Sequence, residues 1–399
     1  MNILFLFQRF SFKSSTIYLD LVDECVRRGH EVYVLAGTSD DVDTKRLHEE
    51  HGSHVAYVRL PDQFHSGKIK KGFVQLMIEP LFLNTLRRLL WDLKIDLMAY
   101  PTPPITLAGV VKKAGEHYGC IKYLMLKDIF PQNAADLGMM GKNSPVFRYF
   151  RRMEKRLYDV SDVIGCMSQA NVEYIRRRES GCAHKLELFP NTVRILPDEE
   201  IPEKRTGDPD ILHLMLGGNL GRPQAVDFLL DGMKKLHETG FDRVRLTIAG
   251  DGTEAARIRG RIESESLSYV NYVSELPRDE YEALLSSCDA GIISLSADFT
   301  IPNFPSRLLS YMQIAKPVLV VTDRCTDMGS IVEKEARCGF FTPSGDIEGF
   351  VNTLGLMYEK REELAEMGRR GREYLKENYA VSRSVDILEQ KLLSFGKEM

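Results

Sequence analysis

The amino-acid sequence predicts an α/β protein made of two doubly wound domains. Short apolar runs of strand length alternate with amphipathic helical stretches along the 399 residues, which is the pattern of parallel βαβ units. A chain of this length is also too long for one compact core. Residues 191–210 are rich in Pro, Asp, Glu and Lys and show no periodicity. We therefore expect domains at 1–190 and 191–380, and a helix over 381–399 that packs back on the first domain.

Each half contains a series of expected strands. In the first half they are Ile3–Phe7, Glu31–Leu35, Ala56–Arg59, Leu97–Tyr100, Lys122–Lys127 and Val163–Cys166. In the second half they are Ile211–Leu216, Arg243–Ala249, Val270–Val273, Ala290–Ser294 and Pro317–Val321. Helical patterns separate these runs, and the first, Ser15–Arg28, stops at Gly29. Ligands of such sheets bind beyond the carboxyl ends of the strands, so two facing domains would enclose a cleft.

Composition excludes several classes of protein. Hydrophobic residues make up 43% and charged residues 28% of the chain, and the formal net charge of -4 argues against a nucleic-acid binder. No run approaches the roughly 20 apolar residues that span a bilayer. The apolar start, Met1–Phe7, lacks a basic region before it and is typical of a first strand. Seven scattered cysteines without a C-x-x-C pair indicate reduced thiols in a cytoplasmic protein.

The first candidate ligand-binding segment is the turn Gly217–Gln224. It follows an expected strand and precedes a helical pattern over 225–237. A Gly-rich turn from strand to helix aims backbone N–H groups at a ligand and favours anions, phosphate above all. Arg222 adds a forked cationic donor, and Pro223 suits the first helical position. Taken alone, the turn is also consistent with a packing role.

A second glycine turn, with Gly250 and Gly252, follows the strand that ends at Ala249. Asp251 or Thr253 is the expected cap of the helix that follows. The alternative is a tight turn that binds nothing.

A third turn lies in the segment 299–312, after the strand that ends near Ser294. We expect a helix from Pro305 to about residue 315, whose first turn offers the Ser306 hydroxyl and the charge of Arg307. The alternatives are that Ser306 is only a cap and Arg307 only a solvated surface charge. Two anion-binding turns at one edge of one sheet favour a diphosphate ligand.

In the first half, Asp128 directly follows the expected strand Lys122–Lys127. It therefore belongs to the carboxyl edge of that sheet, where an acidic group can accept a proton or bind a sugar hydroxyl. The alternative is that Asp128 only caps a turn or a helix.

Two stretches of the first half combine apolar residues at helical spacing with basic residues. Residues 68–94 contain six basic and two acidic side chains. In residues 146–158 the apolar set is Val146, Tyr149, Phe150, Met153 and Leu157, and the basic set is Arg148, Arg151, Arg152, Lys155 and Arg156. Such patterns suit an anionic membrane surface, and a core-facing helix with a solvated basic face is the alternative. Together the two stretches predict weak, peripheral membrane contact.

With these segments in view, the sequence resembles the bacterial glycosyltransferases of family 4, which have the GT-B fold. It is most similar to the branch that builds capsular and O-antigen polysaccharides. The resemblance covers nearly the whole chain and is most specific in Asp128–Ala134, Gly218–Gln224 and Pro305–Met312, with Ala315-Lys316-Pro317 after the last. The pair Pro190-Asn191 matches the usual crossing into the second domain.

The resemblance implies a nucleotide-sugar donor in the second domain and a lipid-pyrophosphate-linked saccharide acceptor in the first. UDP and an N-acetylhexosamine or related amino sugar are the expected donor parts. Transfer would be retaining, with no cofactor and no metal, on the inner face of the cytoplasmic membrane. Asp128, Arg222 and Arg307 would carry catalysis. The donor-binding residues would be Gly218, Asn219, Gly221, Arg222, Gln224, Gly250, Gly252, Val273, Glu275, Pro305, Ser306, Arg307 and Leu308.

The sequence departs from the family pattern at three places. Lys127, not His, precedes Asp128. Pro302 and Ser310 stand where the family often has two glutamates, and the lysine that often follows the Arg222 position is absent. This branch often lacks those acids.

Other functions remain open. A dinucleotide-dependent enzyme shares the doubly wound fold, although Phe7-Gln8-Arg9-Phe10 stands where G-x-G-x-x-G would follow the first strand. A sugar-nucleotide epimerase of the same fold would need acids and a His that face the donor, and the sequence shows no such cluster. A non-catalytic subunit that only binds a nucleotide sugar is consistent with the missing acids.

Overall fold

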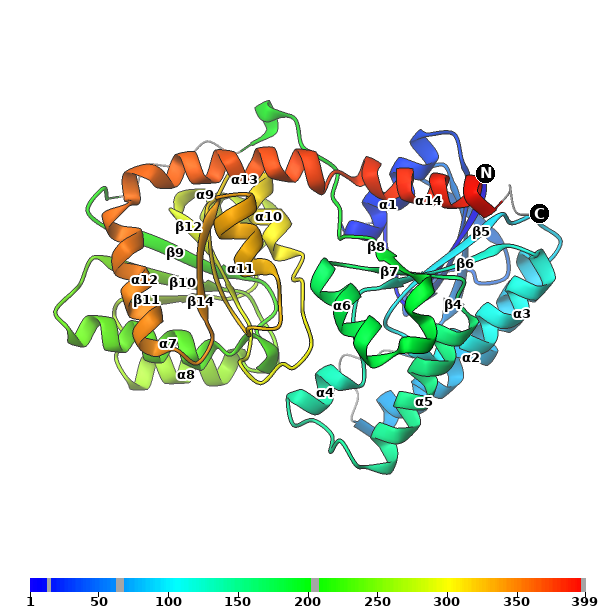
Figure 1. Ribbon diagram of the computed structural model, residues 1–399, viewed down its shortest axis with the longest axis horizontal. Helices are drawn as coiled ribbons and strands as arrows, with labels where there is room; N and C mark the ends of the chain where they lie inside the picture. The colour runs from blue at the N-terminus through cyan, green and yellow to red at the C-terminus, as the bar shows by residue number, and fades with distance from the viewer. Residues whose placement is uncertain (13–15, 62–67, 202–207, 396–399) are drawn as a thin grey trace. The chain divides into compact units, whose positions relative to one another are not determined.

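The computed structural model describes residues 1–12, 16–61, 68–201 and 208–395, without the side chains of residues 68–76 and of Arg278. The chain divides into two compact units (Figure 1). Unit 1 comprises Met1–Arg194 and Ala380–Met399, and unit 2 comprises Ile195–Tyr379. These divisions lie within a few residues of the boundaries expected from the sequence.

Unit 1 is built on an eight-stranded sheet with the order β3-β4-β2-β1-β5-β6-β7-β8. Its strands are parallel except for the pair β3–β4. Their bounds are β1 (Asn2–Phe7), β2 (Glu31–Thr38), β3 (Leu47–Glu50), β4 (Ser53–Arg59), β5 (Leu97–Pro101), β6 (Ile121–Leu126), β7 (Val163–Cys166) and β8 (Leu186–Leu188). β3 and β8 were not expected from the sequence, because these strands are short and partly polar.

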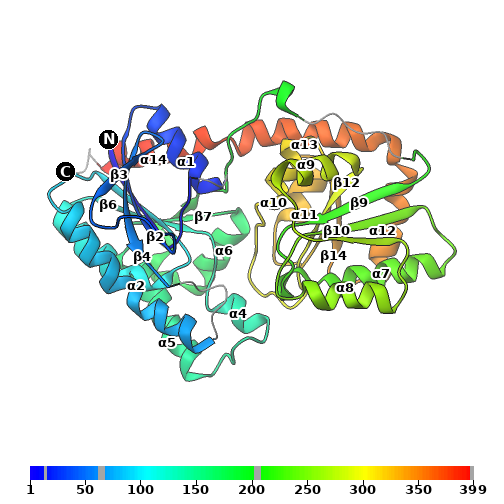
Figure 2. The ribbon, with the colours of Figure 1, turned by 180° about the vertical axis from the view of Figure 1, so that it is seen from behind.

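Helices cover both faces of the unit 1 sheet. They are α1 (Ile17–Arg27), α2 (Lys68–Leu89), η1 (Ile105–Leu107), α3 (Ala108–Tyr118), α4 (Gln132–Asp136), α5 (Pro145–Val160), α6 (Gln169–Arg178), η2 (Ser180–Lys185) and α14 (Val381–Phe395). α1 and α14 share one apolar core with β1 and β2. α2 contacts β4 (Figure 2), and α3, which Figure 1 labels, contacts β6, α2 and α5.

The C-terminal helix α14 is held on α1 by ion pairs as well as by apolar packing. Arg28, which ends α1, donates through Nη1 to Asp386 Oδ1 at 2.6 Å and to Glu389 Oε2 at 2.9 Å. The backbone N–H of Val381 donates to the carbonyl of Val193 at 2.9 Å. The last segment of the chain is therefore part of unit 1, although unit 2 separates it from the rest of that unit in the sequence.

Unit 2 is built on a six-stranded parallel sheet with the order β11-β10-β9-β12-β13-β14. Its strands are β9 (Leu212–Gly217), β10 (Val244–Ala249), β11 (Val270–Val273), β12 (Ala290–Ser294), β13 (Val318–Thr322) and β14 (Gly339–Pro343), of which only β14 was not expected. The strand order reverses between β9 and β12. Doubly wound sheets bind their ligands beyond the carboxyl ends of the strands at such a switch point.

The helices of unit 2 also form two layers. They are η3 (Asp198–Glu200), η4 (Arg222–Gln224), α7 (Val226–Glu238), α8 (Ala255–Ser264), α9 (Arg278–Ser287), α10 (Arg307–Gln313), α11 (Met328–Ser330), the π-turn η5 (Ile331–Glu335), α12 (Ile347–Glu359), η6 (Arg361–Glu363) and α13 (Leu364–Asn378). α7, α8 and α12 share an apolar core with one face of β9 and β10. On the other face, a Cβ on Gly217 would overlap Tyr281 of α9, and a Cβ on Gly291 would lie 2.5 Å from the ring of Tyr311 on α10.

The expected helix over 225–237 begins differently in the structure. Arg222–Gln224 form a separate 3-10 turn, in which the backbone N–H of Gly221 donates to Gln224 Oε1 at 3.0 Å. Ala225 then adopts φ +42, a left-handed conformation that interrupts the helical path before α7 starts at Val226. Pro223 therefore belongs to the short turn and not to the first turn of α7.

Two other expected helix starts are wrong by a few residues. α10 begins at Arg307 and not at Pro305, and it ends before Ala315, which has φ +53. α8 begins at Ala255 after Glu254, with neither Asp251 nor Thr253 as its cap. Asp251 instead closes its own turn, because its Oδ1 accepts from the N–H of Gly252 at 2.7 Å.

Among the helices described, none combines the length and the apolar composition needed to cross a membrane.

Candidate functional site

Arg307 lies directly beside Gly218 at the switch point of unit 2. Gly218 follows β9, has φ +99, and would place a Cβ 2.5 Å from Nη2 of Arg307. A side chain at this position would displace the guanidinium of Arg307, and the positive φ of Gly218 also favours glycine. Arg307 itself is half-buried at the start of α10, after β12. The fold thus brings two predicted site residues from different turns to one point of the sheet edge.

The residues around Arg307 differ in exposure. Ser306 is exposed, and its side chain forms no capping bond to α10. Leu308 is fully buried and Pro305 is half-buried. With seven residues, α10 is a short helix, so the charge of Arg307 and not the helix start is the feature that favours an anion here.

Gly250 and Gly252 allow two turns to approach each other closely. A Cβ on Gly250 would overlap the carbonyl oxygen of Gly218, and a Cβ on Gly252 would overlap that of Leu220. The backbones are also hydrogen bonded, with Gly218 N–H to Ala249 O and Leu220 N–H to Asp251 O at 2.8 Å each. Both glycines therefore have a packing role, which holds the turn that carries Gly218.

The turn after β11 joins the same edge. The N–H of Gly250 donates to the carbonyl of Val273 at 3.0 Å, and Tyr272 Oη donates to the carbonyl of Gly250 at 3.0 Å. Val273 is half-buried and Glu275 is exposed. The predicted residues after β9, β10, β11 and β12 thus lie along one carboxyl edge of unit 2.

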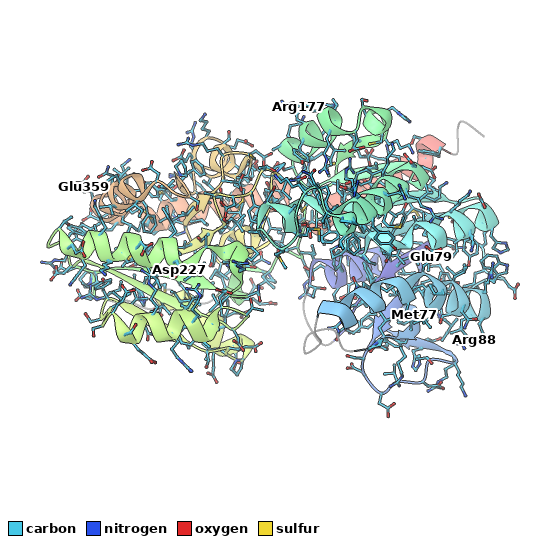
Figure 3. All side chains as sticks on the ribbon, turned by 90° about the horizontal axis from the view of Figure 1, so that it is seen from below. Met77, Glu79, Arg88, Arg177, Asp227 and Glu359 are labelled. Atoms are coloured by element: carbon cyan, nitrogen blue, oxygen red, sulfur yellow. The ribbon has the colours of Figure 1, made fainter. Side chains whose placement is uncertain are left out.

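Arg222 is exposed on the short turn η4, near the carboxyl end of β9. Within the part of the chain that the structure describes, its guanidinium makes no hydrogen bond or ion pair. The turn is anchored by the carbonyl of Pro223, which accepts from Ser296 N–H at 2.8 Å. Arg222 and Gly221 line a small pocket together with Asp227 on α7, which Figure 3 labels. Arg222 and Arg307 thus lie on the turns after β9 and β12, at the same carboxyl edge of the sheet.

Asn219 and Gln224 complete the predicted set on this turn. Asn219 is exposed, and its amide nitrogen would lie 3.3 Å from a Cβ on Gly221. Gln224 is half-buried and is engaged by the N–H of Gly221. Its amide therefore shapes the turn.

In unit 1, Asp128 lies just beyond the carboxyl end of β6. Both of its carboxylate oxygens accept from Asn133 Nδ2, at 2.7 and 2.8 Å. Its backbone is fixed by Thr102, whose Oγ1 accepts from Asp128 N–H at 3.0 Å and donates to Asp128 O at 2.9 Å. Asp128 does not cap α4, which starts after Pro131. The carboxylate is thus oriented by the amide of Asn133, a contact that the sequence pattern did not predict.

Burial raises the pKa of the Asp128 carboxyl to about 6. The N–H of Ile129 and the amide of Asn133 partly offset this effect, because they stabilise the charged form. Across the sheet edge, burial and the charge of Asp128 raise the pKa of Tyr18 on α1. A carboxyl with a pKa near 6 can change its protonation state close to neutral pH, as acid–base catalysis requires.

Lys127, the neighbour of Asp128, points to a different partner. Its Nζ donates to the carbonyls of Phe189 and Pro190 at 3.3 and 3.2 Å, and it lies 5.0 Å from the centre of the Phe189 ring. Burial lowers the pKa of this amine to about 7. Lys127 therefore fastens the segment that leads out of unit 1, and it does not pair with Asp128.

The basic amphipathic helix α5 is only partly a core helix. Leu157 is buried as its spacing predicts, but Val146 and Tyr149 are 54% and 38% exposed. Most of its basic residues are exposed, namely Arg148, Arg152, Lys155 and Arg156, while Arg151 is half-buried and pairs with Glu154. Of the other basic stretch, residues 68–76 lie outside the described side chains, and Met77 on α2 is exposed (Figure 3). Unit 1 thus has an exposed surface that is both apolar and basic.

Three or more His, Cys, Asp or Glu side chains in a metal-binding arrangement do not occur among the residues that the structure describes.

Comparisons with known proteins identify the domain that carries the switch point. Residues 198–374 match the family described as Glycosyl transferases group 1. Over 270 residues, which are 64% of each chain, the sequence is 23% identical to the Probable glycosyltransferase WbjE of Pseudomonas aeruginosa. The match therefore spans less than two thirds of that relative.

Solved structures share the fold over the whole chain. Sucrose-phosphate synthase from Thermosynechococcus elongatus superposes with a TM-score of 0.78 at 12% identity and covers 100% of both chains. Anabaena HepE in complex with UDP has a TM-score of 0.68 at 16% identity, over 99% of this chain and 100% of that one. These likenesses confirm the expected pair of Rossmann-like sheets. Residues 198–374 thus form a glycosyl transferases group 1 domain, and the chain as a whole shares the two-domain fold of these solved structures.

Proposed function

We propose that this protein transfers a sugar from a UDP-sugar to a lipid-pyrophosphate-linked saccharide in capsule or O-antigen polysaccharide biosynthesis. The transfer would retain the anomeric configuration and need no metal, and the sugar would be an N-acetylhexosamine or a related amino sugar. The observation that carries the proposal is the contact between Arg307 and Gly218 at the switch point of unit 2. The nucleotide and the reaction class are also supported by HepE, a GT-B relative in fold that was solved with UDP.

The chemistry at the switch point suits a diphosphate leaving group. When the sugar departs, negative charge grows on the bridging oxygen and on UDP. Arg307 supplies a fixed, forked cation, and Gly218 has no side chain to keep a phosphate away from the backbone. Such preorganised donors are usually the largest catalytic contribution, and removing one typically lowers the rate by about 10²–10³.

Arg222 is the second cation proposed for the donor. Its guanidinium is exposed on the turn after β9 and has no described partner, so it is available to a ligand at this edge. Val273 and Glu275 would line the nucleotide base from the turn after β11, beside Gly250.

Asp128 is the residue proposed to act on the acceptor side, in unit 1. Its carboxylate, oriented by Asn133, would accept a proton from the acceptor hydroxyl or bind a sugar hydroxyl. An acceptor carried on a lipid would be reached at a membrane, and the apolar and basic surface of α5 is the part of unit 1 proposed to rest there.

The experiment that tests this proposal measures thermal stability with UDP, GDP and NAD side by side, for the wild type and for Arg307→Ala. A ligand at about 100 times its Kd should stabilise the fold by about 2.7 kcal/mol. We expect stabilisation by UDP, most of which is lost in Arg307→Ala, and a fall in turnover of about 10²–10³ with UDP-sugars in that variant.

The other outcomes separate the alternatives. Stabilisation by GDP alone would keep the reaction and change the donor. A response to NAD alone would favour a dinucleotide enzyme. Stabilisation by UDP without turnover on any UDP-sugar and acceptor would indicate a binding subunit. An Arg307→Ala variant that unfolds much earlier without ligand would assign Arg307 a structural role.

A further inference from the structure

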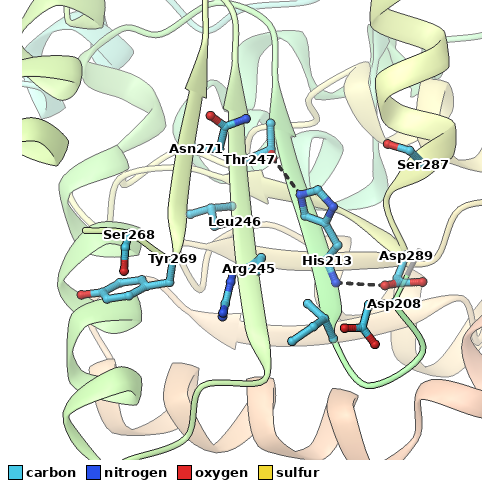
Figure 4. Close-up of a pocket in the computed structure, with 11 residues that line it drawn as sticks. Asp208, His213, Arg245, Leu246, Thr247, Ser268, Tyr269, Asn271, Ser287 and Asp289 are labelled. Carbon is cyan, nitrogen blue, oxygen red and sulfur yellow. Dashed lines mark hydrogen bonds between the residues drawn. The ribbon is translucent and has the colours of Figure 1, made fainter. Parts of the chain in front are cut away.

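A pocket of about 320 Å³ opens in unit 2 at the amino ends of β9 and β10 (Figure 4), whereas Arg307 and Gly218 lie beyond the carboxyl ends of β12 and β9. Its lining side chains come from β9, β10 and β11, from the end of α9, and from the segment just before β12. Asp208, in the segment before β9, also lines it. The volume is at the lower end of the roughly 300–1,000 Å³ of small-molecule pockets, so the ligand it fits is small.

The strand sequences depart from the expected pattern where this pocket lies. Strands of a doubly wound sheet are buried on both faces and read as nearly continuous apolar runs. Here one face carries His213 on β9 beside Arg245 on β10, and Thr247 on β10 beside Asn271 on β11. Further along the same face of β9, Met215 is fully buried. The polar residues thus lie in the amino half of one face of the sheet, at strand positions where apolar core residues are usual.

These polar groups are held in fixed orientations by their own contacts. The ring Nε2 of His213 lies 2.8 Å from Thr247 Oγ1, and the N–H of His213 donates to Asp289 Oδ2 at 2.9 Å (Figure 4). Arg245 donates through Nη1 to the carbonyls of Asp242 and Val244, at 2.6 and 3.0 Å. A preorganised set of this kind loses little conformational freedom when a ligand binds.

The side chains that line the pocket carry little net charge, which disfavours an ionic ligand. Burial lowers the pKa of His213, so this ring is neutral at neutral pH. The charged residues that line the pocket are then two carboxylates, Asp208 and Asp289, and one guanidinium, that of Arg245, which leaves no excess positive charge for a phosphate. The amide of Asn271 and the hydroxyl oxygens of Thr247 and Ser287 add neutral hydrogen-bonding groups, of which Ser287 already donates its own proton to the carbonyl of Leu284 at 2.6 Å. Closely spaced donors and acceptors with little net charge match a neutral polyhydroxyl compound.

We propose that this pocket is a second ligand site, which binds one residue of a neutral saccharide. The site is separate from the donor site, because Tyr281, Tyr311 and Met215 fill the sheet face between the pocket and Gly217. The proposal goes beyond the transfer reaction and does not depend on Arg307.

The test is saturation-transfer-difference NMR on the full chain, with glucose and N-acetylglucosamine as probes. The variants are Asn271→Ala and Arg245→Gln in the pocket, and Arg307→Ala at the donor site. Asn271 is exposed on the edge strand β11, so its replacement should leave the fold intact. Asn352→Ala on α12, an equally exposed asparagine elsewhere in unit 2, is the matched control.

We expect saturable binding of a monosaccharide to the wild type, to Asn352→Ala and to Arg307→Ala. Each pocket variant should bind about tenfold more weakly, as expected for the loss of one well-made hydrogen bond to a polar ligand. Thermal stabilisation by UDP should be the same in the pocket variants as in the wild type, so failure of this proposal is distinguishable from failure of the donor assignment.

Three results would overturn the proposal. The first is the absence of saturable binding by either sugar. The second is binding that Arg307→Ala abolishes and both pocket variants keep, which would place the sugar at the donor site. The third is stabilisation by inorganic phosphate that Arg245→Gln removes while neither sugar binds, which would assign the pocket to an anion. Unfolding temperatures of both pocket variants verify that a loss of signal is not a loss of fold.

Discussion

At the scale of single residues, burial sets the chemistry of Asp128. Its carboxyl has a pKa of about 6 in the folded protein, against 3.8 for an unperturbed group. An ionised Asp128 therefore destabilises the fold above pH 6, by at most about 3 kcal/mol at about 1.4 kcal/mol for each pKa unit. Catalytic titratable groups often lower the stability of the fold in this way, because the surroundings that shift their pKa are not those that best stabilise the folded protein.

This penalty leads to a prediction for Asp128→Asn. The neutral amide can still accept from Asn133 but is not charged, so the variant should unfold at a higher temperature than the wild type at pH 7.5. The gain should shrink as the pH falls from about 6 to about 4, because the wild-type carboxyl is then protonated in the folded state. Turnover should fall to background while UDP still binds. Thermal unfolding across this pH range measures the effect, and a variant that is less stable at pH 7.5 would show that Asp128 is a structural residue.

At the scale of elements, the carboxyl edge of unit 2, where the donor is proposed to bind and which we call the donor edge, depends on the close packing of the turns after β9 and β10. Gly250→Ala should force the Gly218 turn away from Arg307, because the new Cβ would overlap the carbonyl oxygen of Gly218. We expect a loss of stability of about 1–3 kcal/mol and weaker UDP binding, which denaturant unfolding and UDP titration measure.

The matched control is Gly260→Ala. Gly260 lies inside α8, where a Cβ would meet no atom within 4 Å, so alanine should stabilise the helix by about 0.5–1 kcal/mol. If Gly250→Ala behaved like this control, the packing argument for the turn would be wrong.

The helix α5 supports a second prediction at this scale. Replacing its exposed apolar residues, in Val146→Ser with Tyr149→Ser, should weaken binding of the protein to vesicles that contain anionic lipid, and added salt should weaken wild-type binding. Leu356→Ser on α12, at an exposed leucine of unit 2, serves as the control and should bind like the wild type. Vesicle flotation measures all three proteins. Wild-type binding that responds neither to anionic lipid nor to ionic strength would contradict the proposed membrane contact.

At the scale of the whole molecule, the two units have separate tasks in the proposed function. The donor edge lies entirely within unit 2, whereas Asp128 and the return of α14 onto α1 belong to unit 1. Arg28 connects α1 to α14 through Asp386, Glu389 and the carbonyl of Ser382. Interactions within unit 1 should therefore be removable without a direct effect on donor binding.

Arg28→Ala tests this division. Removing the half-buried guanidinium takes one cation from the buried Glu24 and from Asp386 and Glu389 of α14, which should destabilise unit 1 by about 1–3 kcal/mol and lower turnover. The affinity for UDP, measured by calorimetry, should stay unchanged. Arg369→Ala on α13, which removes an exposed ion pair with Glu366, should change stability by less than about 0.5 kcal/mol. A parallel loss of UDP affinity in Arg28→Ala would show that the units do not act separately.

The sequence by itself determined the fold class, the positions of most strands along the chain and the family of the second domain. Alternating apolar runs and helical periodicity are patterns of residues close together in the sequence, so they can be recognised without a structure. The strands β3 and β8 were missed because short, partly polar segments form strands only when a neighbouring strand pairs with them. The start of α7 was misplaced for a similar reason, since Gln224 folds the preceding residues into a turn of their own.

Only the tertiary structure decided which of the predicted residues meet. Gly218 and Arg307 come together because β10 and β11 extend the sheet on one side of β9, and β12 then pairs with β9 on its other side. The same topology turns Lys127 away from Asp128 and gathers His213, Arg245 and Asn271 at the amino ends of the strands. Proximity between distant segments follows from how strands pair and how helices cover them, and that information is spread over the whole chain and is not contained in any one motif.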